Sequence, residues 1–137
     1  MKLGNAEIDV VKSEQGDWVD EIPEMDDLRL KVRGIGNANF RQLQSTLLLG
    51  VPRHKRVGGR IDTPTQDAIT AKCLLNTVLL DWDGLTDDSG KPITYSRDEA
   101  EKLLTKPEYR RFHDAVVWAA TVVAEKRATD QEDATKN

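Results

Sequence analysis

Alternating apolar and polar side chains mark the first part of the chain as a region of β-strands. In residues 6–12, Ile8 and Val10 alternate with polar neighbours, and residues 17–20 follow after a short polar turn. The clearest alternation, in residues 27–33, runs Leu28, Arg29, Leu30, Lys31, Val32, Arg33. Because successive side chains of a strand point to opposite faces, one face should meet a core and the other, cationic face should meet water. The pattern predicts a small antiparallel sheet of two or three strands within residues 1–33.

Helical spacing replaces this alternation from residue 37 onward. Asn37 is a suitable N-cap for a helix that ends near Gly50, with apolar positions at Phe40, Leu43, Leu47 and Leu48. Thr63, Pro64 and Gln66 have the arrangement of a capping box with proline in the first turn, which predicts a second helix start. The stripe of this helix is Ala68, Ala71, Leu75, Val78, Leu79 and Trp82. A stripe of this length predicts the central helix of the fold.

Two shorter patterns complete the chain. Ser96 and Glu99 form a second capping box, which opens a short helix that ends before Pro107. The final helix carries the stripe Tyr109, Phe112, Val116, Ala119, Ala120 and Val123. Residues 126–137 are polar without an apolar period, which predicts a disordered tail. We therefore expect an α+β fold, with a small N-terminal antiparallel β-hairpin or meander followed by about four α-helices, in a single domain of residues 1–125.

Composition and charge indicate the size of the core, the kind of partner and the cellular compartment to expect. Of the 137 residues, 38% are hydrophobic and 32% charged, which suits one modest core under a solvated surface. The net charge of −4 argues against nucleic acid as a partner of the whole chain. The single cysteine, Cys73, allows no intrachain disulfide and sits in an apolar run, as expected for a buried thiol in a reducing compartment. No signal peptide or membrane span is apparent, so we expect a soluble intracellular protein.

Residue types that serve in catalysis or metal binding occur here without the spacing that such sites need. A calcium loop beginning at Asp81 would require glycine where Thr86 stands and glutamate where Pro92 stands. The two histidines, His54 and His113, lack the spacing of a metal pair, and no nucleophile elbow is present. We therefore expect no enzymatic activity, no metal and no cofactor.

Two groups of residues are candidates for contact with a partner. The first is the basic part of residues 51–62, with Arg53, Lys55, Arg56 and Arg60. Its lack of an aromatic residue counts against base stacking. Three interpretations remain, in decreasing order of preference: a solvated loop, contact with an acidic protein, and contact with nucleic acid.

The second group of candidate contact residues is the tryptophans. Trp18, Trp82 and Trp118 fit a core or its edge, but Trp18 or Trp82 can instead be a contact residue, since tryptophan is enriched at binding hot spots.

Several segments of the chain stand in a distinctive order: residues 16–19, 27–33, 37–41, 79–95, 100–104, 107–112 and 115–120. The order places a Trp-Asp-Gly turn, residues 82–84, before the Pro-Ile-Thr-Tyr segment of residues 92–95 and a closing helix. Over residues 16–124 the chain resembles the tail assembly chaperones of long-tailed, siphovirus-like bacteriophages and prophages.

The resemblance implies a non-enzymatic protein of the host bacterial cytoplasm. Such chaperones bind the long, helical tape measure protein and keep it soluble until major tail protein subunits polymerise around it. The resemblance thus implies the tape measure protein and the major tail protein as partners, and no membrane. The sequence does not decide whether the protein forms a homo-oligomer or whether a frameshifted longer form exists. The alternative function is a structural tail-completion or connector subunit of a phage particle.

Overall fold

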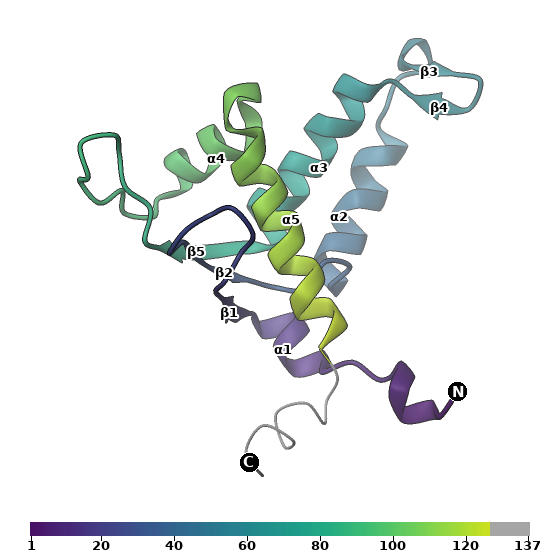
Figure 1. Cartoon of the computed structure of the whole chain (residues 1–137). Coiled ribbons are helices and arrows are strands. Elements are labelled where there is room, and N and C mark those ends of the chain that lie inside the picture. The colour runs from purple at the N-terminus through teal and green to yellow at the C-terminus, as the bar shows by residue number, and fades with distance from the viewer. Residues whose placement is uncertain (127–137) are drawn as a thin grey trace.

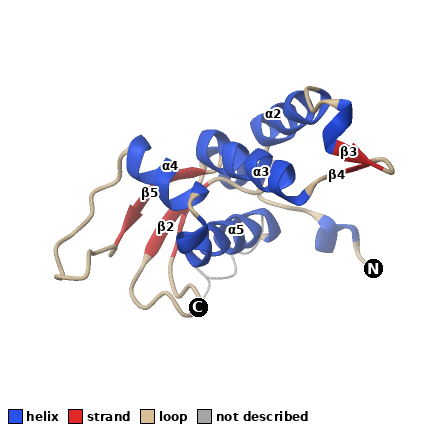
Figure 2. Ribbon diagram, turned by 90° about the horizontal axis from the view of Figure 1, so that it is seen from above, coloured by secondary structure: helices blue, strands red, loops and turns tan. Residues whose placement is uncertain are grey.

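The computed structural model of the chain describes residues 1–126 and contains a small antiparallel sheet packed against helices (Figure 1). The three strands of this sheet are β1 (Asp17–Val19), β2 (Arg29–Val32) and β5 (Leu79–Asp83), in the order β1-β2-β5. The longer helices are α2 (Ala38–Leu49), α3 (Thr63–Thr77), α4 (Arg97–Thr105) and α5 (Arg110–Glu125). Seen from above, α3 lies between α5 and α2 (Figure 2), and α5 packs against β2. The predicted α+β class, with an N-terminal hairpin, is confirmed.

The core lies between the helices and one face of the sheet. Leu30 of β2 is opposite Val19 on one neighbouring strand and Trp82 on the other, and all three side chains are buried. Lys31, one residue further along, is opposite Trp18 and Asp81 on the other face. The alternation of residues 27–33 therefore places apolar side chains on the core face and cationic side chains on the opposite face, as predicted.

Helix caps fix several of the predicted boundaries. The side chain of Asn37 accepts a hydrogen bond from the Phe40 N–H at 2.9 Å, and that of Ser96 accepts one from the Glu99 N–H at 3.1 Å. For α3 the prediction is wrong by one residue, because Asp62 is the cap and accepts from the Thr65 N–H at 2.8 Å. An aspartate caps at least as well as a threonine, so α3 begins one residue earlier than predicted, with Thr63 as its first residue.

The strand predicted at residues 6–12 is wrong. The chain forms a 3₁₀ helix at Leu3–Ala6 and then α1 (Val10–Gln15), whose cap Asp9 accepts from the Lys12 N–H at 3.1 Å. Ile8 and Val10, which supplied the alternation, are both exposed. Two alternating residues offer a sheet little apolar surface, so the locally capped helix prevails.

The central helix was predicted to continue to Trp82, but α3 ends at Thr77 and the chain enters β5. The Thr77 hydroxyl donates to the Cys73 carbonyl at 2.6 Å inside the last turn. Beyond it, β5 completes the sheet beside β2, so one strand of this sheet comes after both α2 and α3 in sequence. The strands are therefore less segregated from the helices than the sequence suggested.

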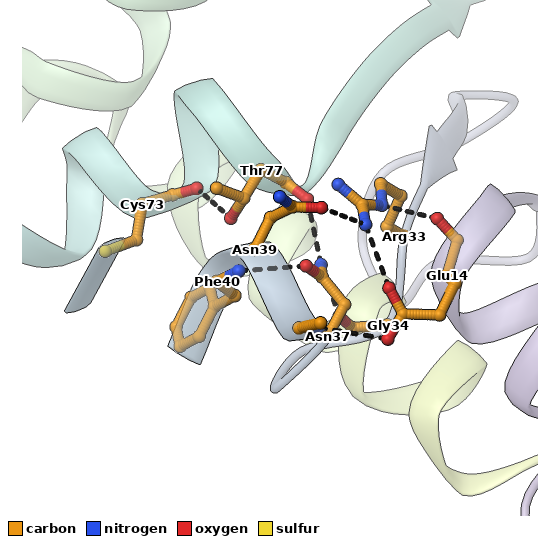
Figure 3. A network of polar contacts seen from close by, with 9 residues as sticks. Glu14, Arg33, Gly34, Asn37, Asn39, Phe40, Cys73 and Thr77 are labelled. Atoms are coloured by element: carbon orange, nitrogen blue, oxygen red, sulfur yellow. Dashed lines mark hydrogen bonds and ion pairs between the residues drawn. The ribbon is translucent and has the colours of Figure 1, made fainter. Parts of the chain in front are cut away.

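A polar network ties α1, β2, α2 and α3 together at one end of the sheet (Figure 3). The Asn37 amide nitrogen donates to the carbonyls of Gly34 and Thr77, both at 2.9 Å. Arg33 donates to the Glu14 carboxylate at 3.0 Å and to the Asn39 side chain at 2.8 Å. This junction fixes where α2 leaves the sheet and how it meets the end of α3.

The end of α5 is joined to the N-terminal segment through Lys126. Its carbonyl accepts from the Asp9 N–H at 2.8 Å, and its ammonium group donates to the Asp17 carboxylate at 3.0 Å. Lys126 was assigned to the predicted disordered tail; it contacts the folded part, and residues 127–137 lie outside the described residues. No helix within residues 1–126 is both long enough and apolar enough to cross a bilayer.

Asp17 makes stability depend on pH in the acid range. Burial raises the pKa of Asp17, but the hydrogen bond and charge of Lys126, the charge of Lys12 and the Trp18 N–H outweigh it, so the pKa is lowered from 3.8. The stabilisation is present above the unfolded pKa of about 4 and disappears as pH falls through the lower folded value. We expect Asp17→Asn to cost up to about 1 kcal/mol at pH 7, because both partners of the pair are partly exposed to solvent.

Urea unfolding of both proteins at neutral pH and below about pH 3 measures this effect. The gap between wild type and Asp17→Asn should close at the lower pH. Asp20→Asn, at an exposed position nearby, is the matched control and should change little at either pH. A gap for Asp17→Asn that is equally large at both pH values would contradict the assignment.

Candidate functional site

A groove runs between α3 and the segment that joins α4 to α5, with a volume of about 740 Å³. The apolar residues on its α3 side are Pro64, Ala68, Ala71 and Leu75, spaced four, three and four residues apart. This spacing puts all four on one helix face. The alanines are small, which leaves the hollow open, and the face is apolar along its length. We call this feature the α3 groove.

Charged side chains of both signs line the rim of the α3 groove. Asp67 on α3 and Arg110 at the start of α5 form an ion pair at 3.9 Å, and Arg110 also contacts Asp114 at 3.1 Å. Lys72, Glu101 and Lys106 complete the charged lining. An exposed pair contributes little to stability, about 0–1 kcal/mol, so the rim mainly keeps the apolar floor surrounded by solvated groups. An apolar floor with a polar rim is the form of groove that accepts one face of an amphipathic helix.

Sequence reasoning did not identify the α3 groove. It assigned Ala68, Ala71 and Leu75 to the core stripe, and the structure buries Ala71 and Leu75 but leaves Ala68 exposed. The available signal was the small size of the two alanines within the stripe. Where the hollow opens depends on how α4 packs against α3, which the sequence does not show.

The basic segment forms a hairpin rather than a plain loop. A 3₁₀ helix (Arg53–Lys55) leads into β3 (Arg56–Val57), which pairs with β4 (Arg60–Ile61). Gly58 and Gly59 form the turn with φ of +57° and +79°, as a two-residue type I′ turn requires. The hairpin stands at the far tip of α2 and α3, away from the sheet (Figure 1). We call residues 53–61 the basic hairpin.

The four predicted cations of the basic hairpin are Arg53, Lys55, Arg56 and Arg60, and all are exposed. Arg56 differs from the others, because its guanidinium group donates to the backbone carbonyls of Leu48 and, at 3.4 Å, Val51. It therefore fastens the hairpin to the C-terminal end of α2, where a positive charge is favourable.

The tryptophans occupy three different environments. Trp82 is 5% exposed, donates to the Ile93 carbonyl at 2.8 Å and contacts the rings of Tyr95 and Phe112 edge-on, so it belongs to the core and is not available as a contact residue. Trp18 is half-buried on the outer face of the sheet, with the Arg29 guanidinium 5.0 Å from its ring centre. Trp118 is 39% exposed on α5, beside a hollow of about 220 Å³. Of the two candidates, only Trp18 keeps an accessible ring.

Three acidic side chains of β5 and the turn after it each have their own hydrogen-bond or ion-pair partner and do not gather at one site. Asp81 accepts from the Trp82 N–H, and Asp83 faces Arg29 at 3.9 Å. Hydrogen bonds from the Ser89 hydroxyl and from the backbone N–H groups of Lys91 and Ser89 hold the pKa of Asp87 below its usual value. Burial raises the pKa of the Cys73 thiol. Among residues 1–126, no three His, Cys, Asp or Glu side chains gather as a metal site would need.

A protein-family model described as YdaY prophage protein matches residues 35–137. The chain belongs to the YdaY prophage protein family. The match begins just before α2, so both the α3 groove and the basic hairpin lie inside the YdaY region, whereas β1 and β2 precede it. No curated protein and no solved structure matches the chain significantly. Membership of the YdaY family agrees with the prophage part of the resemblance, and the family description names no tail component or client.

Proposed function

We propose that this YdaY-family protein is a phage tail assembly chaperone, which binds the tape measure protein and keeps it soluble while the tail tube is built. The observation that carries the proposal is the α3 groove, an open apolar surface on a prophage protein. The ordered resemblance of residues 16–124 to tail assembly chaperones supports the same function. The role needs no catalytic group, since a chaperone of this type acts by binding alone.

The dimensions of the α3 groove suit a segment of helix. The apolar face from Pro64 to Leu75 extends over about 17 Å at 1.5 Å per residue, or about three helical turns. Ala68, which is small and exposed, allows the backbone of a client helix to approach closely. A contact of this size is far smaller than a stable protein interface, so each copy would bind weakly and reversibly. Weak binding fits a chaperone that tail tube subunits must displace.

Co-expression with the tape measure protein encoded by the same prophage tests the proposal. Wild-type protein should raise the soluble fraction of the tape measure protein and co-purify with it. Ala68→Arg places a long charged side chain on the floor of the α3 groove and should reduce the co-purified amount about tenfold or more. Ala68 is exposed and arginine is a good helix former, so the variant should still fold.

The matched control is Ser45→Arg, which introduces the same charge at an exposed position of α2 outside the groove. It should behave as wild type. Failure of the wild-type protein to solubilise or co-purify with the tape measure protein would refute the chaperone function. Stoichiometric presence of the protein in purified virions would instead favour the structural subunit.

A further inference from the structure

The two faces of the basic hairpin differ in character. Arg56 lies opposite Ile61 and Val57 lies opposite Arg60, and residues opposite each other across two strands share a face. The Arg56 side chain reaches back to the end of α2 and Ile61 is half-buried, so this pair forms the inner face. Val57 and Arg60 therefore form the outer face, and Val57 is 77% exposed.

The hairpin is held in place at its base. The Asp62 N–H donates to the Lys55 carbonyl at 3.1 Å, and Asp62 also caps α3. Arg56 makes the second attachment, to α2. With a tight Gly58–Gly59 turn at the tip, the segment is a fixed projection whose outer face is already ordered for binding.

The remaining cations are not held in close ion pairs. Within the described residues, Arg53, Lys55 and Arg60 form no ion pair. The carboxylate of Asp62 is engaged as the helix cap. Its hydrogen bonds with Thr65 lower the pKa of Asp62 most, and the charges of Lys55 and His54 lower it further. The projection is thus strongly positive on a chain whose net charge is −4. Charge of this kind attracts an anionic partner.

Exposed apolar side chains distinguish between a protein partner and nucleic acid. Val57 stands between the cations of the hairpin, and Leu49, which follows the Leu48 carbonyl held by Arg56, is 85% exposed. Phosphate groups gain nothing from such side chains, and the hairpin contains no Phe, Tyr or Trp ring for base stacking. We propose that the outer face of the basic hairpin binds a protein segment in which acidic and apolar side chains alternate. Arg60 of the outer face and the exposed Arg53 and Lys55 of the adjoining 3₁₀ helix pair with its carboxylates. Val57 packs on its apolar side chains, and Arg56 positions the hairpin.

This contact is separate from the α3 groove, so it can be tested without the tape measure protein. The probe is a short synthetic peptide of alternating glutamate and leucine, with fluorescence anisotropy as the readout. The wild-type protein should bind it, and binding should weaken as salt is added. The triple variant Arg53→Glu, Lys55→Glu, Arg60→Glu should weaken binding by at least about tenfold. Absence of binding to the wild-type protein would overturn the proposal.

A second triple variant separates a local site from net charge. Lys2→Glu, Arg41→Glu, Lys91→Glu makes the same change in charge at exposed positions outside the hairpin. It should bind the peptide within about twofold of wild type at moderate salt, where distant exposed charges are screened. An equal loss of binding in both triple variants would overturn the assignment to the hairpin.

The chemistry of the partner has its own test. Val57→Ser should weaken binding of the glutamate–leucine peptide severalfold and leave binding of a glutamate–serine peptide unchanged. A short DNA duplex is the competitor, matched to the peptide in number of negative charges. Tighter binding of the duplex than of the peptide, or no effect of Val57→Ser, would overturn the protein-partner assignment. Arg56→Gln should weaken peptide binding and also speed amide hydrogen exchange in β3 and β4, as expected for a positioning residue.

Discussion

Trp82→Ala is expected to lower the free energy of unfolding by about 3–5 kcal/mol. The Trp82 ring is 5% exposed and lies where β5 meets the residues before α4 and the start of α5. It contacts Tyr95 at 5.0 Å and Phe112 at 5.6 Å between ring centres, both edge-on. Removing it leaves a cavity among rings that come from three parts of the chain, and those parts cannot all collapse into it. Urea unfolding followed by far-ultraviolet circular dichroism gives the value.

Two companion variants identify the source of this loss. Trp82→Phe keeps an aromatic ring but removes the indole N–H that donates to the Ile93 carbonyl, and should cost about 1–3 kcal/mol. Trp118→Ala removes an equally large ring that is 39% exposed, and should cost clearly less than Trp82→Ala. Equal losses for Trp82→Ala and Trp118→Ala would contradict the placement of Trp82 in the core.

The predictable parts of the fold are those that local chemistry decides. Asn37 and Ser96 cap their helices because a side-chain oxygen can satisfy N–H groups two or three residues ahead, whatever the rest of the chain does. The strand within residues 27–33 was recognisable for a similar reason: its long alternation specifies which side chains face the core.

The errors occur where two local patterns compete and distant pairing decides. Leu79 and Trp82 are three residues apart, which suits a helix, but the run also contains enough apolar side chains for a strand. Pairing with β2 makes residues 79–83 a strand, and β2 lies almost fifty residues earlier in the sequence. At residues 6–12 the reverse happened: the alternation involved only two apolar side chains, and a helix capped by Asp9 formed instead of a strand.

The basic residues and the tryptophans were predictable as groups of candidates but not in their roles, whereas the α3 groove was not predicted. The cluster of Arg53, Lys55, Arg56 and Arg60 is visible in the sequence, and all four are exposed. That Arg56 fastens the hairpin depends on the position of the α2 carbonyls, which sequence spacing does not give. The same holds for the tryptophans. The sequence pattern placed Trp82 on the central helix, and only the pairing and packing of β5 show that Trp82 lies on the covered face of the sheet and Trp18 on the other face.

Asn37→Ala is the second substitution with a large expected effect, about 2–4 kcal/mol of unfolding free energy. Asn37 is buried and serves three hydrogen bonds at once (Figure 3). Its side-chain oxygen caps α2 at the Phe40 N–H, and its amide nitrogen donates to the carbonyls of Gly34 and Thr77. Losing the cap costs about 1 kcal/mol, and the two carbonyls lose a donor in a buried place. Thermal unfolding monitored by circular dichroism measures the effect, and the transition should move down by several degrees.

Substitutions at the same junction separate the cap from the donors. Asn37→Ser keeps an oxygen that can cap α2 but cannot reach the Thr77 carbonyl, so it should lose less stability than Asn37→Ala. Asn37→Asp retains the cap acceptor, loses both amide donations and buries a charge beside two carbonyls, so it should destabilise more than Asn37→Ser. Asn39→Ala, at an exposed position in the same turn, should cost less than about 1 kcal/mol. If Asn37→Ser and Asn37→Ala were equally unstable, the cap would contribute nothing. If Asn37→Asp were as stable as wild type, the junction between α2 and the end of α3 would not depend on the amide.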